Sequence, residues 1–394
     1  MTADPFAPAM LGPVRLRNRV LKAATFEGMS PHNVVSSSLI EFHRRIAAGG
    51  TAMTTVSYIA VSRDGMGAPA EIFIHEAAAD GLTRIADVVH AEGARISAQL
   101  GHAGAVGLVR GKRVLGPSKT RTIAGTPVQA ISKGGIDEVV DQFAAGTTML
   151  AQAGFDAVEL HFGHHYLASS FLSPRWNRRV DEYGGTIENR ARLARRVLAA
   201  VRAARDDAGA AMAIIAKLNM TDAVRGGLEP AESLRVAKLL QDDGGLDAIE
   251  LTGGGSQANQ MFMFRGDAPR KEMARVLPNP QRLGFKLLGR ALLRAYPFEE
   301  AYFLPLARQF RSGLEVPLIL LGGINSTAAI RQAIAEGFEF VAIGRALLRD
   351  PDLVAKLESG AVTAGTCVHC NKCMVSIYSG TRCVLDHPEP PAIT

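Results

Sequence analysis

Cysteine is scarce in this sequence and is confined to one segment. Only four of the 394 residues are Cys, and all four lie between Cys367 and Cys383. A disulfide framework spreads its cysteines along a small secreted chain, so this distribution excludes one. Four cysteines so close together indicate instead a local metal site or its remnant.

Long apolar runs are absent as well. No stretch reaches the roughly eighteen uncharged apolar residues of a membrane-spanning helix, and the amino terminus lacks the basic, apolar and small-residue zones of a signal peptide. We therefore expect a cytoplasmic protein with no membrane partner. With 47% hydrophobic and 21% charged residues, the chain has the composition of a globular protein with a large core, which excludes disordered and fibrous classes.

A strong excess of either charge is also missing. The chain has 44 Lys and Arg against 38 Asp and Glu, a formal net charge of +6. This excess favours phosphate-bearing ligands, but both signs are interspersed. The densest basic stretch, from Arg190 to Arg196, has the spacing of a solvated helix face. We therefore expect no nucleic acid partner.

What the sequence does contain is a regular alternation of short apolar runs with longer segments of helical period. The predicted strands are Arg19–Ala24, Ala52–Ile59, Arg95–Leu100, Ala157–His161, Ala213–Leu218, Ala248–Leu251, Pro317–Leu321 and Glu339–Ile343. The helices predicted to follow them are Ser37–Ala48, Ala77–Ala91, Ile136–Ala153, Ile187–Ala204, Pro230–Gln241, Glu299–Ser312, Ser326–Ala335 and Pro351–Glu358. Eight βα units predict an α/β fold, a single (β/α)₈ TIM barrel, with a doubly wound open sheet as the alternative.

Two connections are too long for ordinary βα loops. They are Gly101–Gly135, after the third strand, and Thr252–Pro297, after the sixth. In a barrel both leave the carboxyl ends of the strands, where active sites are built, so we expect them to form walls or lids of a substrate pocket. We expect the barrel to occupy residues 1–360 and a short Cys-containing extension, residues 361–394, to pack on it.

The segment from His161 to Leu193 is richest in residues suited to catalysis. His161 and His164 follow the fourth strand, with Tyr166 close behind. An imidazole can hydrogen-bond near neutral pH, and a phenol can deliver a proton to a developing carbanion. A His-x-x-His pair alone is equally compatible with a structural role. A metal pair is less favoured, because no acidic ligand follows at metal-site spacing.

This segment resembles the signature of the old yellow enzyme family of FMN-dependent ene-reductases. The shared pattern HxxHxYLxxxFLSPxxNxRxDEYGGxxENRxR is intact from His161 to Arg192, and the likeness extends from Asn18 to about Cys383. The resemblance implies that His161 and His164 hydrogen-bond the carbonyl oxygen of an enone and that Tyr166 protonates its α-carbon. His165 and Tyr58 are alternative proton sources.

The resemblance also implies an FMN site along the strand ends. Ala24 and Thr25 are expected to back the flavin ring, and the Gln99 amide to face its pyrimidine edge. Lys217 stands where the family places a cation beside flavin N1, and a buried Lys needs an anion nearby in any case. The phosphate is expected at glycine turns and a guanidinium after strands seven and eight, namely Gly322, Gly323, Gly344 and Arg345.

The four cysteines resemble a [4Fe–4S] motif of one branch of the family, which includes dienoyl-CoA reductases and trimethylamine dehydrogenase. Cys367, Cys370 and Cys373 are followed by Cys383, but the second gap is one residue shorter than in that branch and His369 replaces a glycine. The prediction is therefore no metal first, a [4Fe–4S] cluster second and zinc third.

Together these features predict an NAD(P)H-dependent FMN oxidoreductase that reduces the activated C=C bond of a small-molecule enone. A dienoyl-CoA-reductase-like or amine-dehydrogenase-like enzyme, with or without an iron–sulfur cluster, is the main alternative. An RNA-modifying flavoprotein and a non-catalytic barrel are remote ones. The substrate, the choice of NADH or NADPH and homo-oligomer formation stay open.

Overall fold

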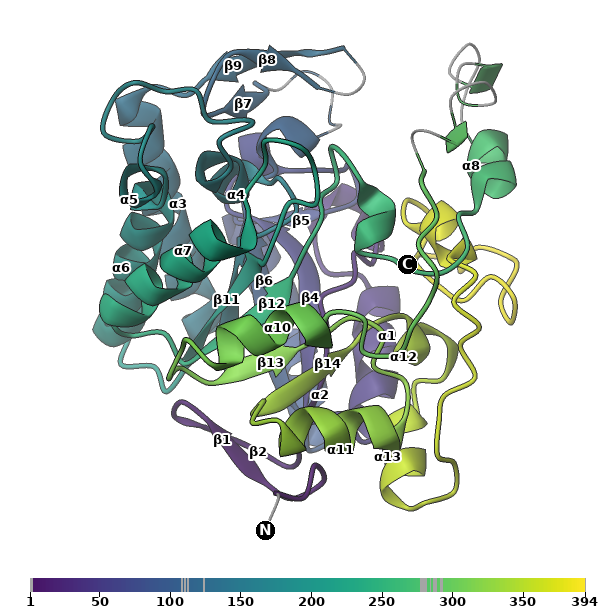
Figure 1. The fold of residues 1–394 in the computed structure, drawn as a ribbon. Helices are drawn as coiled ribbons and strands as arrows, with labels where there is room; N and C mark the ends of the chain where they lie inside the picture. Colours follow the sequence, from purple (N-terminus) through teal and green to yellow (C-terminus); the bar gives the residue numbers. More distant parts are fainter. Residues whose placement is uncertain are drawn as a thin grey trace.

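Eight parallel strands close into a barrel in the computed structural model (Figure 1). The model describes residues 3–393 except 108, 110, 112, 123, 124, 277–281, 284, 286–288, 291 and 292. Strand β3 pairs in parallel with both β14 and β4, which joins the two edges of the sheet. The barrel strands are β3 (Val20–Lys22), β4 (Met53–Ala60), β6 (Arg95–Gly101), β10 (Ala157–Phe162), β11 (Ala213–Asn219), β12 (Ala248–Thr252), β13 (Leu318–Leu320) and β14 (Phe340–Ile343). All eight predicted strands and the closed barrel are confirmed.

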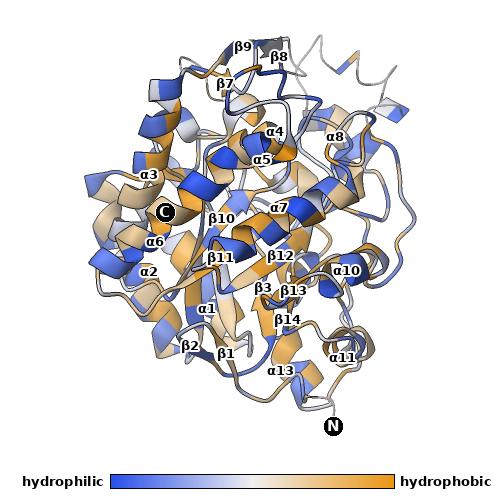
Figure 2. Cartoon of the chain, turned by 60° about the vertical axis from the view of Figure 1, so that its left-hand side comes forward, coloured by the Kyte–Doolittle hydropathy of each residue, from blue (hydrophilic) through white to orange (hydrophobic). Residues whose placement is uncertain are grey.

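Helices surround the barrel and turn their polar faces outward (Figure 2). They are α1 (Ser37–Ala48), α2 (Ala79–Ala91), α3 (Lys133–Gln152), α5 (Ile187–Arg190), α6 (Arg192–Asp207), α7 (Pro230–Asp242), α10 (Leu304–Arg311), α11 (Thr327–Ala335) and α13 (Leu353–Glu358). The predicted helix over 187–204 is two helices, with Ala191 between them. The predicted helix over 299–312 begins only at Leu304, because Ala301 has a left-handed backbone with φ of 53°.

A hairpin that the sequence analysis did not predict closes the amino end of the barrel. It consists of β1 (Ala9–Leu11) and β2 (Val14–Leu16), which pair antiparallel. Leu11, Val14 and Leu16 pack with apolar side chains from the barrel strands. The hairpin escaped prediction because its strands have only three residues each.

The two long connections both lie at the opposite end of the barrel, as predicted (Figure 1). The first contains the small strands β7 (Leu115–Gly116), β8 (Thr120–Arg121) and β9 (Pro127–Ala130), and the second contains α8 (Arg270–Val276). Parts of both connections lie outside the described residues. Further short elements are β5 (Ile72–Phe73), α4 (Leu167–Leu172) and α12 (Arg345–Arg349).

The carboxyl-terminal extension packs on the barrel. Ala364 forms a β-bridge with Ser326, and the Thr381 N–H donates to the carbonyl of Glu27 at 2.8 Å. A Cβ on Gly28 would lie 2.0 Å from the carbonyl oxygen of Ile377, so only glycine permits this approach. Among the described residues, no helix combines the length and hydropathy needed to cross a membrane.

Replacing Leu16 with Ala tests the role of the hairpin. Leu16 is fully buried, so Leu16→Ala should lower the free energy of unfolding by about 2–5 kcal/mol. Met10 lies in the same hairpin but is 57% exposed, so Met10→Ala should change stability by no more than about 0.5 kcal/mol. Denaturant unfolding measures both, and equal effects of the two substitutions would contradict this role for the hairpin.

Candidate active site

Four aromatic and imidazole side chains cluster at the carboxyl end of the barrel. His161 is the last but one residue of strand β10, and its ring centroid lies 5.1 Å from that of His164 and 4.3 Å from that of Tyr166. Tyr58, from β4, lies 5.2 Å from Tyr166 and 6.2 Å from His161. The structure thus brings together the three predicted catalytic residues and adds Tyr58.

Both histidines of the pair are held in the neutral form. Burial, together with the nearby His164 and Lys217, holds the pKa of His161 well below its usual range. Burial and the charge of Lys217 likewise lower the pKa of His164. His161 Nδ1 is buried with no hydrogen-bond partner among the described residues. A buried polar atom without a partner is rare in folded proteins, and here it marks a position where a ligand can bind.

His164 is oriented by two polar residues that the sequence analysis missed. Its Nε2 lies 2.8 Å from Thr252 Oγ1, at the end of β12, and its backbone N–H donates to Asn219 Oδ1 at 3.1 Å. The backbone of His164 is left-handed, with φ of 60°. These contacts fix a strained turn so that the ring faces His161.

Tyr166 keeps its proton and faces an apolar space. Burial raises the pKa of its phenol far above the ordinary value, with a further contribution from the nearby Glu71. Tyr166 packs against a small apolar cluster to which Tyr58 and Met66 also belong, with Phe26 and Phe73 at its edge. The Tyr58 hydroxyl donates to the Gly65 carbonyl at 3.1 Å. Tyr166 is therefore placed to act as an acid in a pocket that excludes water.

His165 does not belong to this cluster. Its side chain is fully buried, its ring centroid lies 5.5 Å from that of Trp176 with the two rings tilted, and its Nε2 lies 3.5 Å from Asp222 Oδ1. The hypothesis that His165 is an alternative proton donor is therefore wrong. Two adjacent left-handed residues, His164 and His165, turn the two rings to different sides.

Charged side chains occupy the barrel interior below the cluster. Lys217 Nζ contacts Glu250 Oε1 and lies 3.5 Å from Glu159 Oε1. A buried Lys217 requires a negative charge nearby, and the structure provides it as two carboxylates that the sequence did not predict. Gln99 Nε2 donates to Glu159 at 2.5 Å, while Gln99 Oε1 accepts from the Ser57 hydroxyl at 3.2 Å.

The predicted phosphate residues lie at the ends of β13 and β14. Gly322 and Gly323 have φ values of 105° and 81°, a conformation that favours glycine. At Gly344 an added Cβ would meet only the Thr25 methyl group, at 3.5 Å. The Arg345 guanidinium donates to Asn371 Oδ1 and to the Arg265 carbonyl. A phosphate role for Arg345 stays a prediction.

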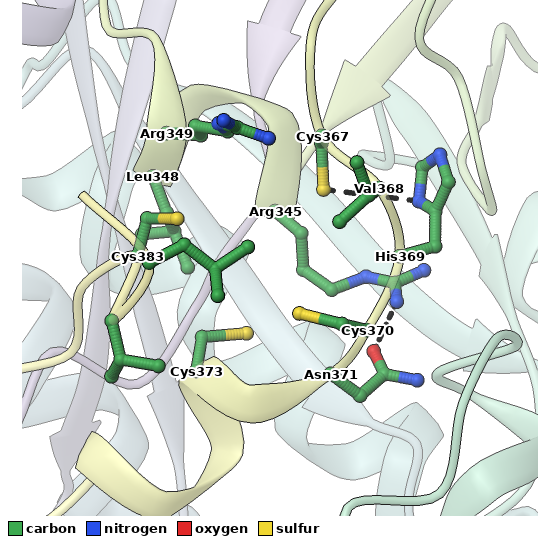
Figure 3. Close-up of a pocket in the computed structure, with 12 residues that line it drawn as sticks. Arg345, Leu348, Arg349, Cys367, Val368, His369, Cys370, Asn371, Cys373 and Cys383 are labelled. Atoms are coloured by element: carbon green, nitrogen blue, oxygen red, sulfur yellow. Dashed lines mark hydrogen bonds between the residues drawn. The ribbon is translucent and has the colours of Figure 1, made fainter.

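The four cysteines line one small pocket together with Arg345 (Figure 3). Burial raises the pKa of Cys373 to about 11, and the other three cysteines add to this while Arg345 opposes it. The sequence prediction that they form one local group is confirmed. Their order of preference for no metal, a cluster or zinc stays a prediction.

Comparison with known proteins identifies the family. The sequence model of the NADH:flavin oxidoreductase / NADH oxidase family matches residues 4–251. The chain belongs to this family. A protein of Rhodococcus erythropolis named 4,4'-dithiodibutanoate disulfide reductase is 50% identical over 390 residues, which cover 98% of this chain and 95% of that protein. Members of the family bind FMN and take their electrons from NADH or NADPH.

Solved structures show the same fold at low identity. The old yellow enzyme homologue from Zymomonas mobilis is 20% identical with a TM-score of 0.75, covering 99% of this chain and 100% of that one. A 2-naphthoyl-CoA reductase is 23% identical with a TM-score of 0.80, over 97% of this chain and 56% of that one. The chain spans about half the length of several further relatives. The resemblance to old yellow enzymes is confirmed.

The residues at the carboxyl end fit FMN. Thr25 Oγ1 is another buried polar atom with no hydrogen-bond partner among the described residues, at the strand end predicted to back the flavin. Lys217 supplies a buried cation, and Gly344 leaves backbone room for a phosphate, whereas Gly322 and Gly323 pack against the rings of Tyr302 and Phe303. Hydroxyl, ammonium and backbone N–H donors are the groups that an electron-rich ring edge and a phosphate require.

Thr252 offers a test of how His164 is positioned. Thr252→Val keeps the volume but removes the hydroxyl beside His164 Nε2, so the binding of a phenol to the FMN-loaded protein should weaken about tenfold. Thr252→Ser keeps the hydroxyl and should bind nearly as well as the unchanged protein. Perturbation of the flavin absorbance measures the affinity. Equal weakening in both variants would show that Thr252 acts by packing alone.

Proposed function

We propose that the protein is an NAD(P)H-dependent FMN reductase of small α,β-unsaturated carbonyl compounds. The observation that carries this proposal is the convergence of two neutral imidazoles and one protonated phenol on a buried, partly apolar space. Neutral imidazole N–H groups suit a carbonyl oxygen, on which negative charge grows during reduction. Burial keeps the Tyr166 phenol protonated, so its proton is available for the carbon beside the carbonyl group.

Each residue has a separate task in this reaction. When bound, FMN supplies the hydride chemistry. His161 and His164 bind and polarise the carbonyl group of the acceptor, and Thr252 keeps His164 in place. Tyr166 donates its proton to the α-carbon. Lys217 would place its positive charge beside the FMN ring, which gains negative charge on reduction.

The walls of the pocket favour a small and largely apolar acceptor. Tyr58 and Met66 are almost fully buried, and the half-buried rings of Phe26 and Phe73 pack against them. These side chains exclude water from the reacting atoms, which strengthens the hydrogen bonds from the histidines. Glu71, buried near Tyr166, disfavours an anionic group at the same depth.

A second candidate is a reductase of organic disulfides, favoured by the 50% identity to 4,4'-dithiodibutanoate disulfide reductase. Reducing a disulfide to two thiols consumes two electrons and two protons. The reduced cofactor would supply both electrons and one proton, and Tyr166, which keeps its proton until a thiolate is released, would supply the second proton and regain it from solvent. The disulfide itself would have to reach the pocket with its two carboxylates kept away from Glu71.

Tyr166→Phe tests the acid. The substitution keeps the ring and removes only the hydroxyl, so reduction of the flavin by NAD(P)H should change little. Reoxidation by cyclohexenone should slow by about 10² to 10⁴, the usual contribution of a positioned acid. Stopped-flow flavin absorbance resolves the two half-reactions. If the variant reoxidises as fast as the unchanged protein, another group supplies the proton; if both half-reactions slow together, Tyr166 only shapes the pocket.

Comparing two oxidants separates the two candidate functions. The NAD(P)H-reduced protein is mixed anaerobically with either cyclohexenone or 4,4'-dithiodibutanoate, and the second-order rate constant of reoxidation is measured for each. We expect cyclohexenone to react faster, because the histidine pair acts on a carbonyl oxygen that the disulfide lacks. A larger rate constant for the disulfide would assign the protein to the second function.

A further inference from the structure

The buried ion pairs of the barrel interior contain more acids than bases. Lys217, in β11, lies between Glu159 of β10 and Glu250 of β12. The side chains of all three are no more than 3% exposed. Lys217 and Glu250 are register partners on adjacent strands, so the fold itself sets their separation. One ammonium group therefore serves two carboxylates.

The remaining titratable groups nearby do not compensate for this excess of carboxylates over ammonium groups. Lys22 is paired with its own carboxylate, with Nζ 2.7 Å from Glu27 Oε1. His43, from α1, lies 3.8 Å from the same oxygen, but burial holds its pKa well below the usual range, so it is neutral. His161 and His164, which face Lys217 from above, are neutral for the same reason. Gln99, which bridges to Glu159, carries no charge.

The interior thus holds two ammonium groups and three carboxyl groups. With every group ionised, it would carry one uncompensated negative charge in a region without water, which is strongly unfavourable. The carboxyl pair at Lys217 is where a proton relieves this charge best, because its two acids share one cation whereas Glu27 has Lys22 to itself. Burial and the neighbouring Glu159 raise the pKa of Glu250 to about 7, and burial raises the pKa of Glu27 to about 7 as well. What distinguishes the pair at Lys217 is therefore that its two acids share one ammonium group.

Lys217 also links this pair to the catalytic cluster. It is the register partner of His161, one strand away, and it is the cation predicted to lie beside the pyrimidine end of FMN. Charge that appears on the bound flavin therefore acts on Lys217 and, through it, on both carboxyl groups.

We propose that Glu159 and Glu250 are positioning residues that hold Lys217 under the flavin and together bind one solvent proton when the flavin is reduced. NAD(P)H gives up a hydride and leaves as NAD(P)⁺, so the flavin gains two electrons and one proton and becomes negatively charged. The solvent proton converts one carboxylate of the pair to a carboxylic acid, and the total charge of the site is unchanged. This inference rests on FMN binding but not on which acceptor reoxidises it.

The pH dependence of the flavin midpoint potential tests the proposal. Each proton taken up with the two electrons changes the reduction equilibrium constant tenfold per pH unit, equivalent to about 30 mV for a two-electron couple. Below pH 7 the pair already holds its proton in the oxidised protein. Above pH 7 the unchanged protein should take up two protons and show a hundredfold change per pH unit.

Substitutions assign the second proton to the pair. Glu250→Gln should lose the additional tenfold dependence above pH 7, and Glu250→Asp should keep it. Glu339→Gln is the matched control, because Glu339 is an exposed acid in an ion pair with Arg19 beside the start of β14, and it should behave as the unchanged protein. Retention of the two-proton dependence in Glu250→Gln would overturn the proposal.

A spectroscopic measurement on the unchanged protein covers the case in which Glu250→Gln does not fold or bind FMN. The infrared difference spectrum between oxidised and reduced protein, recorded above pH 7, should contain the carbonyl band of a newly protonated carboxyl group that shifts in D₂O. Absence of this band, or a one-proton dependence of the potential in the unchanged protein, would also overturn the proposal.

Discussion

Closure of the barrel is the constraint on which the rest of this structure depends. Strand β3 pairs with both β14 and β4, which closes the sheet. Since all eight strands are parallel, their carboxyl ends form a single ring. Residues far apart in the sequence, such as His161 and Thr252, thereby become neighbours. The hairpin β1–β2 covers the other end, where Leu11, Val14 and Leu16 pack on apolar side chains of the strands.

Alternation along the strands explains what lies inside this ring. Side chains two residues apart in a strand point the same way, and three strands repeat a buried charged residue followed by a polar one at the rim. These pairs are Glu159 and His161, Lys217 and Asn219, and Glu250 and Thr252. The inner members form the charge network, and the outer members form or orient the catalytic cluster. The charged side chains inside the barrel and the catalytic side chains at its rim thus follow the same two-residue alternation along the strands.

The sequence predicted the parts of the site that are local and missed the parts that depend on register. His161, His164 and Tyr166 lie within six residues after one strand, so their convergence follows from the strand end alone. Glu159 and Glu250 lie within correctly predicted strands, but their contact with Lys217 depends on the pairing of strands more than 30 residues apart. In both strands an acid stands two residues before a polar residue at the strand end. This spacing is the sequence pattern from which Glu159 and Glu250 could have been predicted to lie near the site.

Other differences have equally local causes. His164 and His165 are the same residue type with the same left-handed backbone, and their partners distinguish them: His164 Nε2 contacts Thr252, whereas His165 Nε2 lies beside Asp222. The cysteines were correctly grouped because they are close in the chain, yet their pocket is completed by Arg345, which belongs to the barrel. Contacts between segments far apart in the sequence, such as this one, become visible only in a structure.

The most direct measurement of the central claim is a crystal structure of the FMN-loaded protein with a bound phenol. The account predicts that the phenol oxygen lies within hydrogen-bond distance of both His161 and His164, with Tyr166 over the same face of the flavin and Lys217 at its pyrimidine end. A phenol held elsewhere on the flavin, or a flavin whose pyrimidine end lies away from Lys217, would contradict it.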